Sequence, residues 1–317
     1  MSAISHSYAW TMPTESNFID RLKALALHPA ARGFNDDCAV LSGVSGDLVI
    51  THDMIAEGVH FLPEADPADV AWRLVAVNLS DLASSGAKPL GVLMGYSLSG
   101  DAKWDAAFVT GLEAALTHFD VPLIGGDTVA ISPGAQRTMG LTAMGLAPAG
   151  GAPSRAGAMV GDAVWVTGTI GDAGAGLELA ERCQVEPAAL LKAYNRPDPK
   201  LVEGQKLARQ VSAMMDVSDG LLVDAARLAK ASGLAIEVDL RAVPLSPDYV
   251  GYKGKDAKAR IAAVTAGDDY QLLFTLPDAE EPVIPATRIG ACGQGEGITL
   301  VYDGEAYPLP ETLGYLH

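Results

Sequence analysis

Aspartates recur along this chain at the expected ends of helices and strands, usually beside glycine or serine. Any one of them alone is typical of a turn, because Asp side chains readily bond nearby backbone groups there. If several met in space, two carboxylates about 4 Å apart would repel by roughly 4 kcal/mol at an effective dielectric constant near 20. The group would then need protons or cations. Its members are Asp36, Asp37, Asp53, Asp81, Asp127, Asp216, Asp219, Asp268 and Asp269.

Oxygen ligands without a Cys or His cluster favour a hard cation, and Mg²⁺ is the first choice. Magnesium shares phosphate oxygens readily, so the pattern predicts a metal-bridged polyphosphate site and therefore ATP chemistry. The P-loop motif GxxxxGK[ST] is absent. The stretch GTIGDAG, residues 168–174, has the wrong spacing for GxGxxG. It is compatible with an anion-binding nest, but a tight turn into a helix is the favoured interpretation.

One helix is expected to carry an acidic residue into the protein interior. Asp66 and Pro67 are typical of a helix start, and Gly86 is typical of the residue that follows a helix. An apolar stripe between them leads by a further helical step to Asp81, and it consists of Val70, Leu74 and Val77. Either Asp81 reaches water at a frayed helix end or it faces a cation, and the other aspartates favour the cation.

Strands and helices are expected to alternate through both halves of the chain, which predicts an α/β or α+β fold. Helices are expected over 17–27 and 103–118, and strands over 47–51, 90–98, 121–124 and 138–146, with a further short strand after Asp37. A passage rich in Gly, Ala and Pro over 147–162 indicates a domain boundary. The predicted domains are therefore 1–149 and 150–317.

The composition narrows the class of protein. Of the 317 residues 49% are hydrophobic, and the formal net charge of −17 argues against nucleic acid or an anionic membrane as a partner. The sequence contains neither a recognisable signal peptide nor an apolar run of the roughly 20 residues that a bilayer span needs. The cysteines at 38, 183 and 292 lack CxxC spacing, so a reducing cytoplasm is expected.

Several motifs together resemble the thiamine-monophosphate kinase family, within the superfamily of aminoimidazole-ribonucleotide synthetase. In chain order they are NDDCAVL, ITHDMIAEGVHF, AVNLSDLASSGAKP, LIGGDT, SRAGAMVGD, VTGTIGDAGAGL, RPDPK, DVSDGLLVDAARLAKASG, VPLS and GDDYQLLF. The resemblance implies transfer of the ATP γ-phosphoryl group to thiamine monophosphate, the last step of thiamine diphosphate synthesis. It also implies a two-domain fold and a homodimer in which the N-terminal mixed sheets pair, with the nucleotide beside them.

The same resemblance implies the site residues. The residues expected to hold several magnesium ions are Asp37, Thr51, His52, Asp53, Asp81, Asp127, Asp216 and Asp219. The expected ATP contacts are Gly126, Asp127, Arg155 and Ser218, and the expected contacts to thiamine monophosphate are His60, Asp268 and Tyr315. Three of these residues have a structural role as the alternative. Arg155 would hold the linker in place, His60 would pack within its loop, and Tyr315 would belong to the core. Asn35, His52, Met54 and Asp268 depart from the usual family pattern, and Asp268 stands where Glu is usual.

The expected mechanism is direct in-line transfer without a covalent nucleophile or a general base, because a phosphate monoester is already nucleophilic. A selenophosphate synthetase would need a reactive cysteine in a glycine-rich N-terminal segment, and the hydrogenase-maturation relative would need a C-terminal cysteine. This chain has neither. The remaining alternatives are an aminoimidazole-ribonucleotide synthetase-like enzyme and a non-catalytic protein that binds magnesium and nucleotide.

Overall fold

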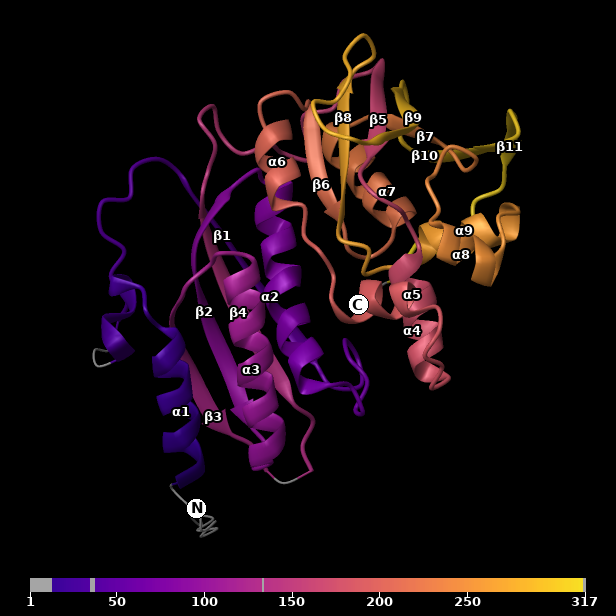
Figure 1. The fold of residues 1–317 in the computed structure, drawn as a ribbon. Helices are drawn as coiled ribbons and strands as arrows, with labels where there is room; N and C mark the ends of the chain where they lie inside the picture. The colour runs from indigo at the N-terminus through magenta and orange to yellow at the C-terminus, as the bar shows by residue number, and fades with distance from the viewer. Residues whose placement is uncertain (1–12, 35–37, 133, 316–317) are drawn as a thin grey trace, which may run out of the picture.

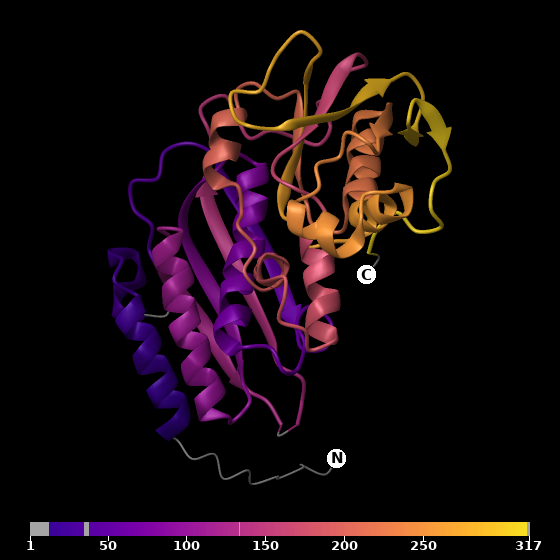
Figure 2. The ribbon, with the colours of Figure 1, turned by 45° about the vertical axis from the view of Figure 1, so that its right-hand side comes forward.

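The computed structural model describes residues 13–34, 38–132 and 134–315, which form two β-sheets flanked by helices (Figure 1). The elements of the first half are α1 (Pro13–Leu25), η1 (Pro29–Phe34), β1 (Leu48–Ala56), α2 (Pro67–Ser84), β2 (Lys88–Leu98), α3 (Ala102–His118), β3 (Leu123–Ala130) and β4 (Thr138–Leu146). Their strands form one sheet in the order β1-β4-β2-β3, in which only β2 and β3 are parallel. Both α2 and α3 cover one face of this sheet, and α1 packs against α3 (Figures 1 and 2).

The second half builds a seven-stranded sheet in the order β11-β10-β7-β9-β5-β8-β6. Its strands are β5 (Asp162–Val166), β6 (Ala213–Val217), β7 (Ala235–Asp239), β8 (Gln271–Pro277), β9 (Thr287–Gly293), β10 (Gly297–Tyr302) and β11 (Glu305–Tyr307). Its helices are α4 (Asp172–Glu181), α5 (Ala188–Asn195), α6 (Leu201–Leu207), α7 (Leu221–Ser232), α8 (Pro247–Lys253) and α9 (Ala257–Thr265). The mixed α/β class predicted from the sequence is confirmed.

Alternation along the strands gives the second sheet two apolar faces. On β5, Val164 and Val166 belong to the large core with α7, whereas Ala163 and Trp165 belong to a smaller cluster on the opposite face. This is the period of two that a strand imposes on its side chains. The smaller cluster also contains Ala83 of α2, so the second sheet packs partly against a helix of the first half.

Helix α2 begins and ends where the sequence predicts. The Asp66 carboxylate accepts a hydrogen bond from the backbone N–H of Ala68 at 2.9 Å, Pro67 is the first helical residue, and Gly86 adopts a left-handed φ of 61°. The helix runs between the first sheet and the second half of the chain (Figure 1). It is therefore buried nearly all round, and the residues with no exposed surface include Ala71, Leu74, Val75, Ala76, Asn78, Leu79, Ser80, Leu82 and Ala83.

Glycine allows α2 and α6 to approach each other closely. A Cβ added to Gly204 on α6 would lie 2.0 Å from the carbonyl oxygen of Ala83 on α2. Near the other end of α2, the Trp72 indole N–H donates to the carbonyl of Pro197 at 3.0 Å. The two halves are thus joined along the length of one helix.

Several expected boundaries were wrong. Strand β1 runs on to Ala56 and β3 runs on to Ala130, so His52, Asp53, Gly126 and Asp127 lie inside strands. Ladder hydrogen bonds to neighbouring strands explain both extensions, since β1 pairs with β4 and β3 pairs with β2 along these residues. No strand forms over 38–41, which lie outside every element, and α8, α9 and β9 to β11 were not anticipated. Within the described ranges, no helix combines the length and the apolar character that crossing a membrane requires.

The contact between α2 and α6 makes a testable prediction. Replacement Gly204→Ala should lower the free energy of unfolding by about 1–3 kcal/mol, because the new methyl group would overlap the Ala83 carbonyl. The matched control is Gly251→Ala on α8, where a Cβ would meet nothing within 4 Å. That change should stabilise by roughly 0.5–1 kcal/mol through helix propensity. Urea unfolding of both variants measures the difference, and equal stability of Gly204→Ala and the parent would contradict the close contact.

Candidate functional site

A cleft of about 840 Å³ lies between the two halves of the chain. Its walls come from α2, the end of β1 and its following loop, the end of β6 and the turn before β8. Sequence reasoning selected nine of the residues that line it: Asp53, His60, Asp81, Arg155, Asp216, Ser218, Asp219, Asp268 and Tyr315. The cleft therefore gathers residues that are more than 250 positions apart in the chain.

The wall from the first half is built by β1 and α2 together. The Thr51 hydroxyl donates to the Asp81 carboxylate, which ties the strand to the last turns of the helix. The buried Asn78 side chain accepts from the backbone N–H of Asp53 at 2.8 Å and donates to the carbonyl of Leu74 at 2.9 Å. These bonds hold Asp53 and Asp81 on the same side of β1, beside the helix.

Asp216 is the most deeply buried acid of the cleft, with 2% of its surface exposed. It alternates on β6 with Met215 and Val217, which enter the large core, so its own side chain faces α2. There it accepts a hydrogen bond from the Ser80 hydroxyl at 2.6 Å. Burial, and next the negative charge of Asp81, raise the pKa of the Asp216 carboxyl to about 7.

The turn after β6 presents Ser218 and Asp219 to the cleft. Its backbone is held by the fully buried Asp224, whose carboxylate accepts from the N–H of Ser218 at 3.0 Å and of Asp219 at 3.1 Å. Arg227 donates to Asp219 at 2.5 Å and to Asp224 at 2.8 Å. Burial raises the pKa of Asp224 to about 6, and Arg227 opposes that rise. An arginine thus already neutralises part of the acidic charge here.

Two of the predicted substrate contacts, His60 and Tyr315, line the cleft from outside the helices and strands. The Tyr315 backbone N–H donates to the carbonyl of Asp219 at 2.8 Å, and its side chain is 50% exposed, so Tyr315 is not a core residue. The ring of His60 accepts from the backbone N–H of Ala56 at 3.1 Å, which orients the imidazole on the loop after β1. Arg155 is exposed, and its backbone carbonyl accepts from the Ser232 hydroxyl at 2.8 Å.

Sequence reasoning missed Arg73, which also lines the cleft. Arg73 donates to the Asp268 carboxylate at 2.9 Å and to the carbonyl of Tyr194, and its guanidinium lies 4.2 Å from the Tyr194 ring centre. Burial would lower the pKa of Arg73, but Asp268 and the neighbouring tyrosines make the net change a rise. Its spacing in the sequence could have identified it, since Arg73, Val77 and Asp81 follow one another at steps of four and so share one helix face.

The GTIGDAG stretch forms a tight turn into α4, and two of its backbone N–H groups donate to an internal carboxylate. The buried Asp269 carboxylate accepts from the N–H of Gly171 at 2.8 Å and of Ala173 at 3.4 Å. Burial raises the pKa of Asp269 well above its ordinary value, and the two backbone bonds oppose this. An internal carboxylate therefore fills the position that an anion would take at this helix start.

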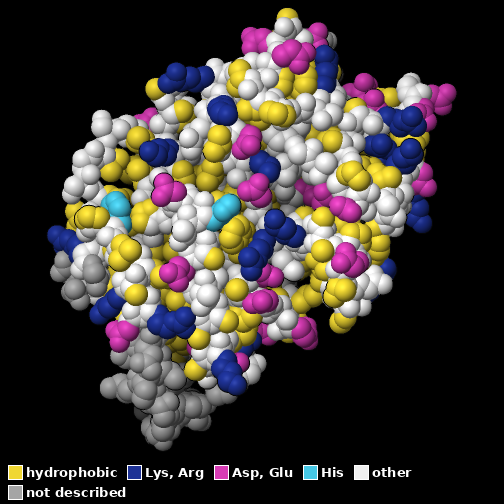
Figure 3. All heavy atoms as spheres, in the orientation of Figure 1, with side chains coloured by type: hydrophobic (Ala, Val, Ile, Leu, Met, Phe, Trp, Pro, Cys, Tyr) yellow, Lys and Arg dark blue, Asp and Glu magenta, His cyan; other side chains and the backbone are white. Residues whose placement is uncertain are grey.

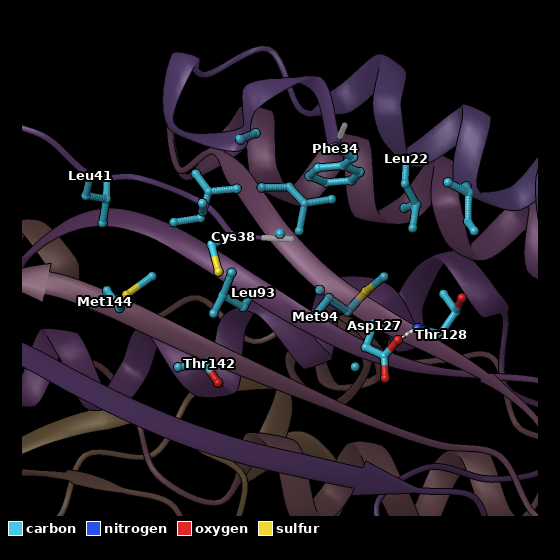
Figure 4. A pocket seen from close by; sticks show the side chains of 18 residues that line it. Leu22, Phe34, Cys38, Leu41, Leu93, Met94, Asp127, Thr128, Thr142 and Met144 are labelled. Atoms are coloured by element: carbon cyan, nitrogen blue, oxygen red, sulfur yellow. Dashed lines mark hydrogen bonds between the residues drawn. The ribbon is translucent and has the colours of Figure 1, made fainter. Parts of the chain in front are cut away.

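A second cavity, also of about 840 Å³, holds the other predicted nucleotide contacts (Figure 4). It lies between the segment from α1 to Leu41 and the strands β2 and β3, and Gly126 and Asp127 line it. Its walls are otherwise mostly apolar, with Leu22, Phe34, Leu93 and Met144 labelled in Figure 4. The Asp127 carboxylate accepts from the backbone N–H of Thr128 at 2.9 Å.

Strand order separates this cavity from the cleft. Asp53 is on edge strand β1 and Asp127 is on edge strand β3, and the sheet order places β4 and β2 between them. Three strand spacings amount to about 14 Å. The two carboxylates are therefore not neighbours within one chain, so the aspartates singled out from the sequence do not all meet in one place. The His52 ring contacts the Thr142 hydroxyl at 2.9 Å instead of entering the cleft, and Asp37 lies outside the described residues.

The donor set suits magnesium in kind, although a finished site is not preformed. Within the part of the chain that the structure describes, no three His, Cys, Asp or Glu side chains are close enough to hold a metal ion. Even so, the buried Asp216 beside Asp81 is a repulsive pair that a divalent cation would relieve. The face in Figure 3 shows acidic and basic side chains interspersed, so the net negative charge is not gathered there in one patch.

Comparison with known proteins defines the class first. The family model of the AIR synthase related protein N-terminal domain matches residues 35–147, and the C-terminal domain model matches residues 159–303. Hydrogenase maturation protein HypE shares the fold at a TM-score of 0.74 and 20% identity. The fold and the interdomain cleft thus define an AIR synthase related protein.

Curated relatives show which family within this class the chain belongs to. Thiamine-monophosphate kinase of Salmonella typhimurium is 38% identical over 91% of this chain and 92% of its own, and that of Caulobacter vibrioides is 37% identical over 96% and 91%. The solved thiamine-monophosphate kinase of Stenotrophomonas maltophilia superposes with a TM-score of 0.81 at 36% identity, covering 92% of this chain and 96% of that one. The chain belongs to the thiamine-monophosphate kinase family.

The raised pKa of Asp216 makes a prediction for the protein in the presence of a chelator. The folded protein binds the Asp216 proton more tightly than the unfolded chain does, so protonation of Asp216 favours the folded state. This contribution to stability is complete below the ordinary pKa of about 4 and is lost as the pH rises through about 7. Replacement Asp216→Asn should therefore become more stable relative to the parent with increasing pH, towards a limit of about 4 kcal/mol. Urea unfolding at several pH values measures this trend, and a difference independent of pH would contradict it.

Proposed function

We propose that this protein transfers the γ-phosphoryl group of ATP to the phosphate of thiamine monophosphate, forming thiamine diphosphate and ADP. The observation that carries the proposal is family membership over nearly the whole chain, with relatives named thiamine-monophosphate kinase at 36–38% identity. A structure described as AaThiL complexed with AMPPCP and TMP aligns over 98% of this chain with a TM-score of 0.77. AMPPCP is an ATP analogue, so that protein holds both substrate types together.

The chemistry requires little beyond positioning and charge neutralisation. The acceptor phosphate is largely ionised near neutral pH, so it needs no general base. The main obstacle is the repulsion between two polyanions that must approach in line. A cleft that combines carboxylates with the guanidinium groups of Arg73, Arg155 and Arg227 supports such a reaction, because its charges can meet both metal ions and phosphates.

Bound magnesium ions would supply neutralisation of the phosphate charge. The residues proposed to hold them are Asp37, Thr51, His52, Asp53, Asp81, Asp127, Asp216 and Asp219. The burial of Asp216 beside Asp81 supports the inclusion of these two residues. His52 would contribute through its backbone carbonyl, since its ring contacts Thr142.

The proposed nucleotide contacts are Gly126, Asp127, Arg155 and Ser218, and they line two cavities. This division is compatible with an extended ligand whose base end occupies the apolar part of the cavity beside β3 while its phosphates extend past Gly126 and Asp127 towards the cleft. The proposed contacts to thiamine monophosphate are His60, Asp268 and Tyr315, all of which line the cleft. Because Asp268 is tied to Arg73, it would act as part of a fixed wall.

Residues 1–149 are proposed to bind nucleotide and magnesium and to dimerise, and residues 150–317 to complete the active site. The first sheet ends at Leu146 and the second begins at Asp162, which supports this division. A cytoplasmic location is proposed because Cys38, Cys183 and Cys292 are all free.

The open face of the first sheet supports the proposed homodimer. Leu48, Ile50 and Met54 alternate along β1 and are 47%, 61% and 55% exposed, respectively. Such a row of exposed apolar side chains on a strand is typical of a surface covered by a partner. A second copy of this chain is the partner that we propose for it.

Replacement Ile50→Glu should convert the dimer into a monomer, because a buried carboxylate at the paired face would lose hydration without a counter-charge. Sedimentation velocity measures the change. The control is Val185→Glu, at a side chain that is 75% exposed on the loop after α4 and should leave the dimer intact. A parent protein that sediments as a monomer would contradict the proposal.

The decisive experiment incubates the protein with ATP, Mg²⁺ and thiamine monophosphate and measures thiamine diphosphate. Replacement Asp127→Asn should lower kcat/KM by about 100-fold or more, because it removes a charge that faces the nucleotide phosphates and their magnesium. The fold should survive, since Asp127 is exposed. The control Asp278→Asn alters an exposed acid that pairs with Arg288 away from both cavities. Near-normal turnover by Asp127→Asn would refute its role, and tight ATP binding without product would favour a binding-only protein.

A further inference from the structure

Arg73 is an unusually buried charge for a helix that carries mostly apolar residues. Its side chain is 4% exposed, and it lies on the wall of the cleft. A guanidinium in such a position is costly unless carboxylate or carbonyl oxygens accept its hydrogen bonds. The groups that accept hydrogen bonds from Arg73 therefore indicate which parts of the protein it holds in place.

All of these neighbours come from the second half of the chain. The Asp268 carboxylate accepts at 2.9 Å, the Tyr194 carbonyl accepts a second bond, and the Tyr194 ring lies 4.2 Å from the guanidinium carbon. Arg73 therefore joins α2 both to the end of α5 and to the turn before β8.

The turn that Arg73 contacts is conformationally strained. Asp268 has φ of 67° and Tyr270 has φ of 48°, values that residues other than glycine rarely adopt. Backbone bonds hold the turn to the end of β6, since Asp268 N–H donates to the Ser218 carbonyl at 2.7 Å and Tyr270 N–H donates to that of Val217 at 2.8 Å. The Tyr270 hydroxyl donates to the second oxygen of Asp268 at 3.0 Å. With Arg73, both oxygens of this carboxylate are held.

We propose that Arg73 is a positioning residue: it fixes the Asp268 turn against α2 and so sets the shape of the cleft that receives the phosphate-bearing acceptor. This inference rests on the proposed function and extends it to a residue that would act through Asp268. The side-chain partners of Arg73 are Asp268 and Tyr194, and none of the proposed nucleotide contacts is among them. Loss of Arg73 should therefore affect the acceptor more than the nucleotide.

Steady-state kinetics with both substrates tests the role. Replacement Arg73→Met should raise KM for thiamine monophosphate by about tenfold or more, since a charge-assisted hydrogen bond is lost on the acceptor side. KM for ATP should stay within about twofold of the parent value, because Arg73 bonds to Asp268 and Tyr194 and to none of the proposed nucleotide contacts. Arg73→Lys should give an intermediate KM for the acceptor, because one ammonium can pair with Asp268 but cannot reproduce the forked contact with Tyr194.

A second interdomain ion pair provides the matched control. Arg196 contacts Asp69 of α2 at 2.5 Å and lies over the Trp72 ring, so it joins the same helix to the same segment as Tyr194 does. It does not line the cleft. Replacement Arg196→Met should leave both KM values unchanged, whatever its effect on thermal stability.

The double variant Arg73→Met with Asp268→Asn tests whether one residue acts through the other. Its KM for thiamine monophosphate should be no higher than that of the more impaired single variant, whereas independent roles would multiply the two effects. Should Arg73→Met fail to fold, the same comparison on Arg73→Lys decides the question.

The outcomes separate two kinds of failure. Absence of product from the parent protein would overturn the proposed function, and this inference with it. A productive parent, combined with equal changes in both KM values, with unchanged KM values, or with multiplicative effects in the double variant, would overturn the positioning role alone.

Discussion

The burial of one helix on nearly all sides is the constraint on which the rest of the molecule depends. Helix α2 packs against the first sheet with one part of its surface and against the second half of the chain with another. Because it has almost no solvent face, its polar residues must find partners inside the protein. Asn78 accepts a hydrogen bond from the backbone of Asp53. Ser80 donates to Asp216, and Arg73 donates to Asp268. Each of these partners lines the cleft.

The same burial creates an electrostatic problem that the structure only partly solves. Arg73 pairs with Asp268, and Arg227 pairs with Asp219 and Asp224, so the acids on that side have counter-charges. Asp216 has a hydroxyl donor and the charge of Asp81 nearby, and its raised pKa reflects this. A divalent cation would relieve the repulsion between Asp216 and Asp81. Cations bound there would in turn attract phosphate groups, although the net charge of the protein is −17.

The order of strands in the first sheet places the two cavities at opposite edges of that sheet. Edge strand β1 borders the cleft, and edge strand β3 borders the apolar cavity that Asp127 lines. The glycines at 125 and 126 let β3 pair closely with β2, since a Cβ at Gly126 would lie 2.1 Å from the Met94 carbonyl. The proposed nucleotide, with a flat aromatic base and a charged polyphosphate, would use both of these surfaces.

Local interactions could be read from the sequence by itself. Capping by Asp66, the proline after it and the glycine at 86 determine where α2 begins and ends, because these effects act within one turn of a helix. The acidic composition of the site could also be predicted, and nine of the predicted residues line one cleft. Motif resemblance identified the family, since the motifs span most of the chain in order.

Only the tertiary structure decided which of these residues are neighbours. Sequence spacing does not reveal that two central strands separate Asp53 from Asp127, because strand order depends on long-range pairing. It also does not reveal that Arg73 meets Asp268, 195 positions away, since that contact exists only once both sheets have packed on α2. Local rules determined the ends of α2 and the acidic residues that the chain carries, whereas strand pairing and the burial of α2 determined which of these residues are neighbours.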